Sequence, residues 1–337
     1  MSDSTIPVVY SPTHNDCMIA NPTGWFRETF LTHVVQNNLA AIAVTPEAAT
    51  VIVIFETWAE KNHAWWTNAL TDRFLADHIE KTYVVSHDDY SAGLMPGCYT
   101  SLTPARFDVN WHRSCAYPAV YSWHPTLESL RTSLSSKSTT NCVYTFRGNV
   151  ASHHVRSHLQ RAVQNDPSGR FTDITSAFRS HSETQVVEYV QEILDCDFVL
   201  CPRGHSPSTY RLYEALQLGR CPVVIADDWI PPLGPDWSTC SITIPERQIH
   251  RIPEILMNQR HHSQELGAQA RRVWEQWFDE GSKFVGFLKS IIDLQTQRRH
   301  RPPLLLKHLR RRLDSWTFSW NAGWTSLQRI SRRCGGQ

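Results

Sequence analysis

The chain has 337 residues, a length that predicts about two domains with room for a sizeable hydrophobic core. Hydrophobic residues make up 41% of it and charged residues 19%, with 14 glycines and 19 prolines, which excludes collagen-like, low-complexity and wholly disordered chains. The net charge of +1 hides an asymmetry, because residues 298–337 carry ten arginine and lysine residues against one aspartate.

Targeting signals and cysteine usage indicate where the chain resides. No apolar run reaches the ~20 residues that a bilayer span needs. The first residues lack a basic patch followed by an apolar core, so we expect no signal peptide. The nine cysteines include no CxxC pair, and an odd number fits reduced thiols better than a disulfide framework. These features predict a cytoplasmic protein.

The first part of the chain alternates between strand and helix patterns. The predicted elements are strands at residues 48–55, 82–86 and 116–121 and a helix at 56–78, with an irregular stretch at 90–113. The run at 48–55 (AATVIVIF) is apolar and β-branched, as in the buried strands of parallel sheets. We therefore expect a first α/β domain over residues 1–135.

A polar stretch at residues 134–141 marks the boundary to a second α/β domain, expected over 136–296. Its predicted strands are 142–146, 197–201 and 222–226, and its predicted helices are 152–165, 182–194, 206–218, 251–258 and 262–294. The helix ending at Leu218 starts at Ser206 or Ser208 in this prediction, because either hydroxyl can cap it. Gly219 follows as a left-handed cap.

The segment from Asp197 to Asp228 carries the chemistry. A buried strand leads through Pro202–Gly204 into a helix, and the next strand ends at Asp227. In open α/β sheets, ligands bind beyond the carboxyl ends of the strands, which places Arg203, the helix N-terminus and Asp227 at one edge. Helix N-terminal N–H groups and a guanidinium favour a diphosphate. The chain lacks GxGxxG and GxxxxGK[ST] here, which disfavours dinucleotide oxidoreductases and P-loop NTPases.

Arg211 and Glu214 are three residues apart and share one face of the predicted helix. Glu214 could hold a hydroxyl such as that of a ribose. The alternative is that the two side chains form an ordinary ion pair on the surface, and their spacing alone leaves both interpretations open.

An ordered series of motifs resembles the exostosin-like (GT47-type) glycosyltransferases. The series covers roughly residues 197–256 and comprises Pro202-Arg203-Gly204, Thr209-x-Arg211-x-x-Glu214-Ala215-Leu216, Gly219-x-x-Pro222-Val223, Asp228-Trp229-Ile230-Pro231 and Trp237. Two further segments resemble the family more weakly: Phe146-Arg147-Gly148 with Arg156, and Ser86-His87-Asp88. The resemblance implies a GT-B-like α/β fold, in which two Rossmann-like domains face each other across a cleft and the C-terminal one holds a nucleotide-sugar.

The resemblance also implies the reaction and roles for individual residues. A glycosyl unit passes from a nucleoside diphosphate sugar, UDP- or GDP-linked, to a hydroxyl of a glycan or glycolipid, with inversion. Arg203 and Arg211, with Arg147, are assigned to the diphosphate and Glu214 to the ribose. The remaining nucleotide-sugar-binding residues are expected to be Gly204, Thr209, Asp227 and Asp228. Enzymes of this fold usually need no metal, so we expect no metal and no permanently bound cofactor.

Inversion calls for a general base. Asp88 and His87, at the end of a predicted strand in the first domain, are the candidates, although His-Asp-Asp before Tyr-Ser-Ala-Gly is also ordinary turn chemistry. The first domain lacks the glycine expected soon after His-Asp, which weakens the acceptor half of the resemblance. Two other interpretations stay open: another GT-B transferase of fucosyltransferase type, and a nucleotide- or carbohydrate-binding protein without catalysis.

The basic tail, residues 297–337, places arginines beside Trp316, Phe318, Trp320 and Trp324. This composition indicates peripheral contact with an anionic membrane through residues 298–333. The alternative is a helix packed back on the first domain. We expect no nucleic-acid partner, because the tail holds no recognition motif.

Overall fold

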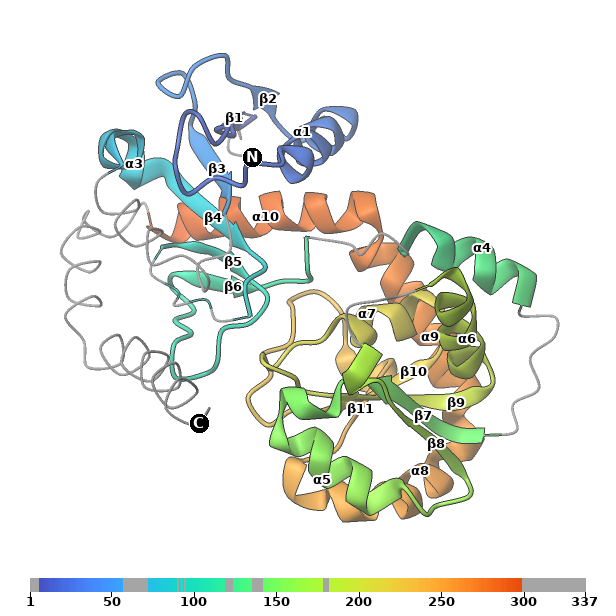
Figure 1. Cartoon of the computed structure of the whole chain (residues 1–337). Coiled ribbons are helices and arrows are strands. Elements are labelled where there is room, and N and C mark those ends of the chain that lie inside the picture. The colour runs from blue at the N-terminus through green and yellow to red at the C-terminus, as the bar shows by residue number, and fades with distance from the viewer. Residues whose placement is uncertain are drawn as a thin grey trace.

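The computed structural model describes residues 6–56, 72–89, 91, 93, 95–118, 124–134, 142–177 and 182–298. Their strands form two sheets whose strand pairs are all parallel, with helices packed around them (Figure 1). The predicted α/β class with two Rossmann-like sheets is confirmed. The expected membrane contact of residues 298–333 falls almost wholly outside the described residues and stays a prediction.

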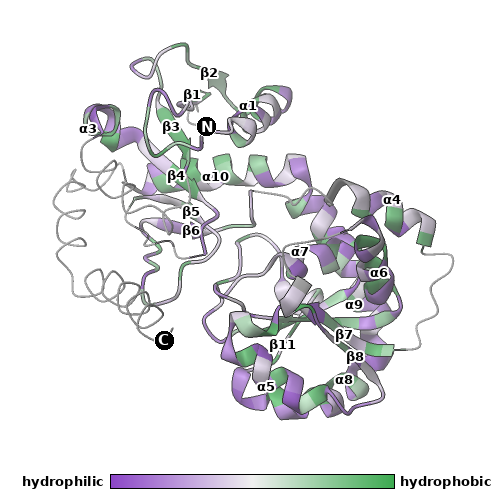
Figure 2. Ribbon diagram, viewed as in Figure 1, coloured by the Kyte–Doolittle hydropathy of each residue, from purple (hydrophilic) through white to green (hydrophobic). Residues whose placement is uncertain are grey.

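In the first sheet the strand order is β2-β1-β3-β4-β5-β6. The strands are β1 (Val8–Tyr10), β2 (Ala41–Ile42), β3 (Val51–Phe55), β4 (Thr82–Ser86), β5 (Gly97–Tyr99) and β6 (His112–Ser114), and the helices of this part are α1 (Trp25–Gln36) and α3 (Arg73–His78). Figure 2 shows hydrophobic residues along β3 and β4, whose members are all buried. This burial on both faces explains why these two strands could be predicted from apolar runs.

The prediction for the rest of the first sheet was incomplete and partly wrong, and strands β1 and β2 were not predicted at all. Residues 97–99 and 112–114, within the stretch interpreted as irregular, are strands β5 and β6. The predicted strand at 116–121 is not a strand in its described part, 116–118. The physical reason is that β6 has the sequence His-Arg-Ser, buried through hydrogen bonds and an ion pair and not through apolar side chains. Most of the predicted helix at 56–78 lies outside the described residues, apart from α3.

In the second sheet the strand order is β11-β10-β9-β7-β8. The strands are β7 (Cys142–Gly148), β8 (Gly169–Asp173), β9 (Cys196–Pro202), β10 (Cys221–Ile225) and β11 (Ile242–Thr243), and the helices are α5 (His154–Val163), α6 (Glu183–Leu194), α7 (Tyr210–Gln217), α8 (Ile252–Gln259) and α9 (Ser263–Val273). The predicted strands and helices of residues 142–258 are confirmed to within a few residues. The edge strands β8 and β11 were not predicted, because both are only partly buried.

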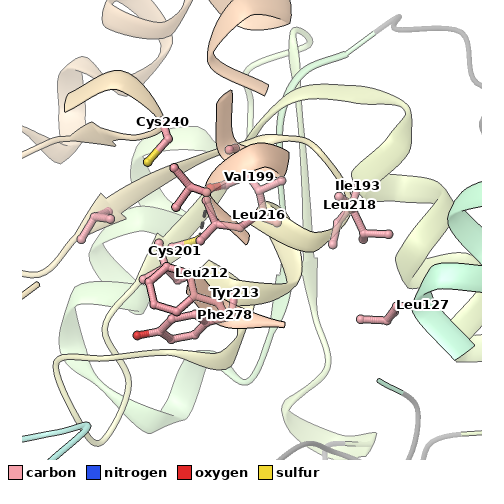
Figure 3. Close-up of a cluster of buried hydrophobic side chains, with 14 of the residues drawn as sticks. Leu127, Ile193, Val199, Cys201, Leu212, Tyr213, Leu216, Leu218, Cys240 and Phe278 are labelled. Atoms are coloured by element: carbon pink, nitrogen blue, oxygen red, sulfur yellow. Dashed lines mark hydrogen bonds between the residues drawn. The ribbon is translucent and has the colours of Figure 1, made fainter. Parts of the chain in front are cut away.

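Helix α7 starts later than predicted. Its first residue is Tyr210, and Thr209 occupies the N-cap. The predicted caps at Ser206 and Ser208 are wrong because Ser206 uses its hydroxyl within the preceding loop, donating to the carbonyl of Ser208 at 2.9 Å. Gly219, with a φ of +68°, ends the helix as expected. Figure 3 shows the apolar face of α7, with Leu212 and Leu216, packed over Val199 and Cys201 of β9.

The predicted helix at 262–294 is two helices, and they pack on different sheets. α9 ends at Val273, a π-helical turn follows at Trp274–Phe278, and α10 spans Glu280–Arg298. Asp279 restarts the helix by accepting a hydrogen bond from the Ser282 N–H at 2.6 Å. Phe284 and Leu288 of α10 are buried in the core of the first sheet, toward which α10 extends (Figure 1).

Helix α4 (His124–Leu134) lies within the residues expected for the first domain but packs against the second sheet's helices. Its Leu127 is fully buried in the cluster that includes Ile193 of α6 and Leu216 of α7 (Figure 3). The boundaries expected at residues 135 and 296 stay predictions. However, α4, which precedes the first boundary, packs with the second sheet, and α10, most of which precedes the second boundary, packs on the first sheet.

Among the described residues, eight cysteines are buried with free thiols, and no helix is long and apolar enough to cross a membrane.

Candidate functional site

A cavity of about 490 Å³ lies at the carboxyl ends of β7 and β9. Its walls come from the turn after β7, the loop between β9 and α7, helices α5, α6 and α7, and two residues of the first part of the chain. The lining residues that matter below are Asp89, Tyr117, Arg147, Gly148, Asn149, Arg156, Tyr189, Gly204, His205, Ser206, Thr209, Tyr210, Arg211 and Glu214. The edge of the sheet predicted to bind a ligand is therefore hollow.

Arg211 is buried in the wall of this cavity, with only 9% of its surface exposed. Its guanidinium carbon lies 4.6 Å from the centre of the Phe146 ring, and its Nη2 donates to the carbonyl of Arg147. Its Nε and Nη1 groups are buried and have no hydrogen-bond partner among the residues that the structure describes. Glu214 is 4% exposed, so the alternative of an ordinary surface ion pair is wrong for these two side chains.

Arg156 is a second buried guanidinium at the same cavity, and it was not among the predicted site residues. It donates to the carbonyls of Arg203 at 3.0 Å, Asn149 at 2.9 Å and Pro202 at 3.3 Å. Burial, together with the nearby charge of Arg211, lowers the pKa of Arg156 to about 9. Its sequence signal was that α5 follows β7 through a short turn, in the same strand–turn–helix arrangement that connects β9 to α7.

Glu214 is held by a neighbouring helix. Its carboxylate accepts a hydrogen bond from the hydroxyl of Tyr189 on α6. Burial raises the pKa of Tyr189 well above its ordinary value, and the negative charge of Glu214 adds to the effect. Tyr189 therefore stays protonated as a donor and orients the carboxylate at the cavity wall. Gly204 and Thr209, also predicted as site residues, line the cavity with Glu214.

Arg147 lines the cavity, but carboxylates of α6 engage its charge. Its Nη2 and Nε lie 2.5 and 3.1 Å from the two oxygens of Glu192, and Nη2 is 3.5 Å from Glu188. The hydrogen bond to Glu192 raises the pKa of Arg147, against the opposing effect of burial. A role in holding diphosphate stays a prediction for Arg147, since a ligand would have to compete with Glu192.

Three other predicted site residues do not line the cavity: Arg203, Asp227 and Asp228. Arg203 Nη1 lies 2.9 Å from Asp228 Oδ2, so the two side chains pair with each other. Asp227 exchanges hydrogen bonds with Glu246, accepting from its backbone N–H at 3.0 Å. These contacts join the ends of β9 and β10 to their neighbouring loops.

The first part of the chain contributes Asp89 to the cavity, whereas the predicted bases His87 and Asp88 do not line it. His87 and Asp88 are 6% and 2% exposed. Burial lowers the pKa of His87 to about 4, and its ring packs 5.3 Å from that of Phe26. The structure therefore brings together Arg147, Gly204, Thr209, Arg211 and Glu214 and separates His87 and Asp88 from them.

Comparison with known proteins agrees with this geometry. Residues 100–259 match the family model described as the exostosin GT47 domain. This region, just under half of the chain, is similar to the exostosin GT47 domain. The exostosin match extends from β6 to α8 and includes every cavity residue named above except Asp89. The motif series that suggested this family from the sequence lies within the matched residues.

Individual exostosins resemble the same region. A protein named Exostosin-1 homolog from Caenorhabditis elegans is 37% identical over 100 residues, which is 29% of this chain and 26% of the relative. Exostosin-2 of Mus musculus is 35% identical over 97 residues, 28% of this chain and 14% of the relative. Exostosin-2 of Bos taurus is 27% identical over 136 residues, 40% of this chain and 19% of the relative. The matches thus span about a quarter or less of these exostosins.

Proposed function

We propose that this protein is a glycosyltransferase that moves a sugar from a nucleoside diphosphate sugar to a hydroxyl of a glycan or glycolipid. The observation that carries the proposal is the pair of buried guanidinium groups, Arg156 and Arg211, at one cavity. Two nitrogen atoms of the Arg211 guanidinium, Nε and Nη1, have no hydrogen-bond partner within the described part of the chain. Two like charges buried together are unfavourable until an anion lies near them. The similarity to the exostosin GT47 domain supports the same chemistry.

A diphosphate fits this wall on charge and on hydrogen bonding. The first turn of α7 lines the cavity, and its backbone N–H groups attract anions. When the sugar–phosphate bond breaks, negative charge grows on the departing diphosphate. Arg211, held in place by Phe146 and the Arg147 carbonyl, can stabilise that charge without rearranging. Glu214, oriented by Tyr189, can accept hydrogen bonds from ribose hydroxyls.

The acceptor would enter from the side of the first sheet. Asp89 and Tyr117 line the cavity together with residues of the second sheet, which supports a GT-B-like arrangement with the donor on one wall and the acceptor on the other. We assign inversion of the anomeric carbon to the reaction because it follows from the family and calls for a base on the acceptor side.

Nucleotide binding tests the proposal. We expect UDP or GDP, compared with CDP, to raise the melting temperature of the full chain. Arg211→Ala should weaken binding about 10- to 100-fold, because a charge-assisted hydrogen bond is worth about 1.5–3 kcal/mol. Arg161→Ala, on the exposed side of α5, is the matched control and should bind like the wild type.

Release of the nucleoside diphosphate from a sugar nucleotide, with water as acceptor, separates an active transferase from a nucleotide-binding protein. A panel of UDP-glucose, UDP-galactose, UDP-N-acetylglucosamine, UDP-glucuronic acid, GDP-mannose and GDP-fucose covers both nucleotides. If the chain binds none of these nucleotides and releases nucleoside diphosphate from none of the sugar nucleotides, the proposal is contradicted.

A further inference from the structure

We propose that Asp89 is the general base of this reaction, accepting the proton of the attacking hydroxyl. The inference rests on the proposed function and adds a residue that the exostosin match, residues 100–259, does not contain. It starts from the position of Asp89 at the cavity that Arg211 also lines.

The two charged groups come from different sheets. Asp89 follows β4 of the first sheet by three residues, whereas Arg211 is on α7 beside the second sheet. A glycosyl transfer needs this separation, because the leaving diphosphate and the attacking hydroxyl stand on opposite sides of the anomeric carbon in an inverting displacement. The cavity of about 490 Å³ leaves room for a sugar between the two walls.

Tyr117 holds Asp89 in place. Its hydroxyl lies 3.5 Å from Asp89 Oδ1 and 3.2 Å from the Ser206 hydroxyl, and Ser206 belongs to the loop that leads into α7. The Tyr117 ring stacks on Tyr210, the first residue of α7, with ring centres 3.9 Å apart and planes 22° apart. The base is thus fixed to the element that carries Arg211, which keeps the two reacting groups at a constant separation.

The surroundings of Asp89 suit a base. Burial raises its pKa above the ordinary value, the negative charge of Asp88 adds to this, and Ser206, His205 and Tyr117 oppose it. A raised pKa makes the carboxylate a better proton acceptor.

The other carboxylates near the site are less suited. Glu214 also lines the cavity, but it shares α7 with Arg211 and accepts a hydrogen bond from Tyr189. Asp88 is buried and does not line the cavity.

The proposed step balances with no further reagent. The acceptor oxygen forms a bond to the anomeric carbon while its proton moves to the Asp89 carboxylate. The bond between the anomeric carbon and the phosphate oxygen breaks, and its electron pair leaves with the nucleoside diphosphate. Arg211 stabilises that charge, and the protonated Asp89 returns its proton to solvent after product release.

The test compares Asp89→Asn with the wild-type full chain, using the sugar nucleotide that the wild type hydrolyses. Asparagine keeps the size and the acceptor for Tyr117 but cannot take a proton. We expect kcat to fall at least about 100-fold while the nucleotide Kd stays within about 2-fold. Asp77→Asn, an exposed carboxylate of α3, should match the wild type in both. Asp88→Asn should lower kcat far less than Asp89→Asn.

The pH profile of the wild type adds a test that needs no variant. Its kcat should fall with acidification as Asp89 becomes protonated, and Asp89→Asn should lose this acidic limb. Wild-type kcat in Asp89→Asn, a larger loss in Asp88→Asn, or no acidic limb in the wild type would overturn the role of Asp89 and leave the transferase standing. A wild-type chain that neither binds nucleotide nor releases it would overturn both.

Discussion

Arg113 on β6 and Asp293 on α10 form an ion pair between residues 180 positions apart in the chain. Nη2 and Nε of Arg113 lie 2.5 and 3.1 Å from Asp293 Oδ2, and Nη2 also donates to Gln297 at 3.0 Å. Arg113 is 3% exposed whereas Asp293 is about half exposed. The pair ties the last described helix to the edge strand of the first sheet, so the chain returns to the sheet with which it began.

Replacing Asp293 by alanine should lower the free energy of unfolding by about 1–2 kcal/mol. Arg113 keeps its bonds to backbone carbonyls but loses a charged partner while it remains buried, and the exposure of Asp293 moderates the cost. Urea denaturation measures the change. Arg73→Ala, which removes an exposed pair within α3, should cost less than about 0.5 kcal/mol. Equal losses in the two variants would contradict a structural role for the Arg113–Asp293 pair.

Phe284→Ala should lower the free energy of unfolding by about 3–5 kcal/mol, the range for removing a buried phenylalanine ring. Phe284 is fully buried, with its ring centre 6.0 Å from that of Phe55 and 5.6 Å from that of Phe287. The same denaturation measurement applies, with Leu233→Ala at an exposed position as control. A loss below about 1 kcal/mol would show that α10 does not pack on the first sheet in solution.

Gly148→Ala should weaken nucleotide binding about tenfold without unfolding the chain. A methyl group at this position would lie 2.6 Å from Arg211 Nη2 and 2.9 Å from the Phe146 ring, so the guanidinium must move away from its position at the cavity. Isothermal titration with the stabilising nucleotide measures the effect. Gly286→Ala in α10 meets no atom within 4 Å and should bind normally. Normal binding by Gly148→Ala would argue against Arg211 as a diphosphate ligand.

In the wild type we expect stability to fall as the pH rises from about 6.5 to 8. Glu56→Gln should reduce this fall. Burial raises the pKa of Glu56 to about 8 in the folded chain, so between its ordinary value and pH 8 the folded state holds a proton that the unfolded state releases. Stability therefore falls as pH rises through this window. His87, whose folded pKa is lowered to about 4, has the opposite effect but only below pH 6.5.

Melting temperatures between pH 6.5 and 8 measure this dependence. The wild-type value should fall across the window, the Glu56→Gln value should fall less, and exposed Glu80→Gln should behave as the wild type. A slope unchanged by Glu56→Gln would mean that this carboxyl is not protonated in the folded chain.

The local pattern of apolar and polar residues was sufficient to predict most strands and helices of the second sheet. Cys196–Pro202 is buried throughout, and its apolar run predicted a strand with a ligand-binding turn after it. Arg211 and Glu214 followed from that strand, because a helix after such a turn places residues three apart on one face. Strand β6 escaped prediction because its buried side chains are polar, and polar burial depends on partners such as Asp293 that are distant in the sequence.

The amino-acid sequence by itself determined the α/β class, the resemblance of residues 197–256 to exostosin-like glycosyltransferases and the helix that carries Arg211 and Glu214. Each of these depends on residues close together along the chain. Only the tertiary structure decided that Asp89, and not its neighbour Asp88, lines the cavity, that Arg156 joins Arg211 there, and that α10 covers the first sheet. The physical reason is that burial, charge proximity and the direction of a side chain depend on elements brought together by folding. Adjacent residues of one loop can therefore meet entirely different surroundings.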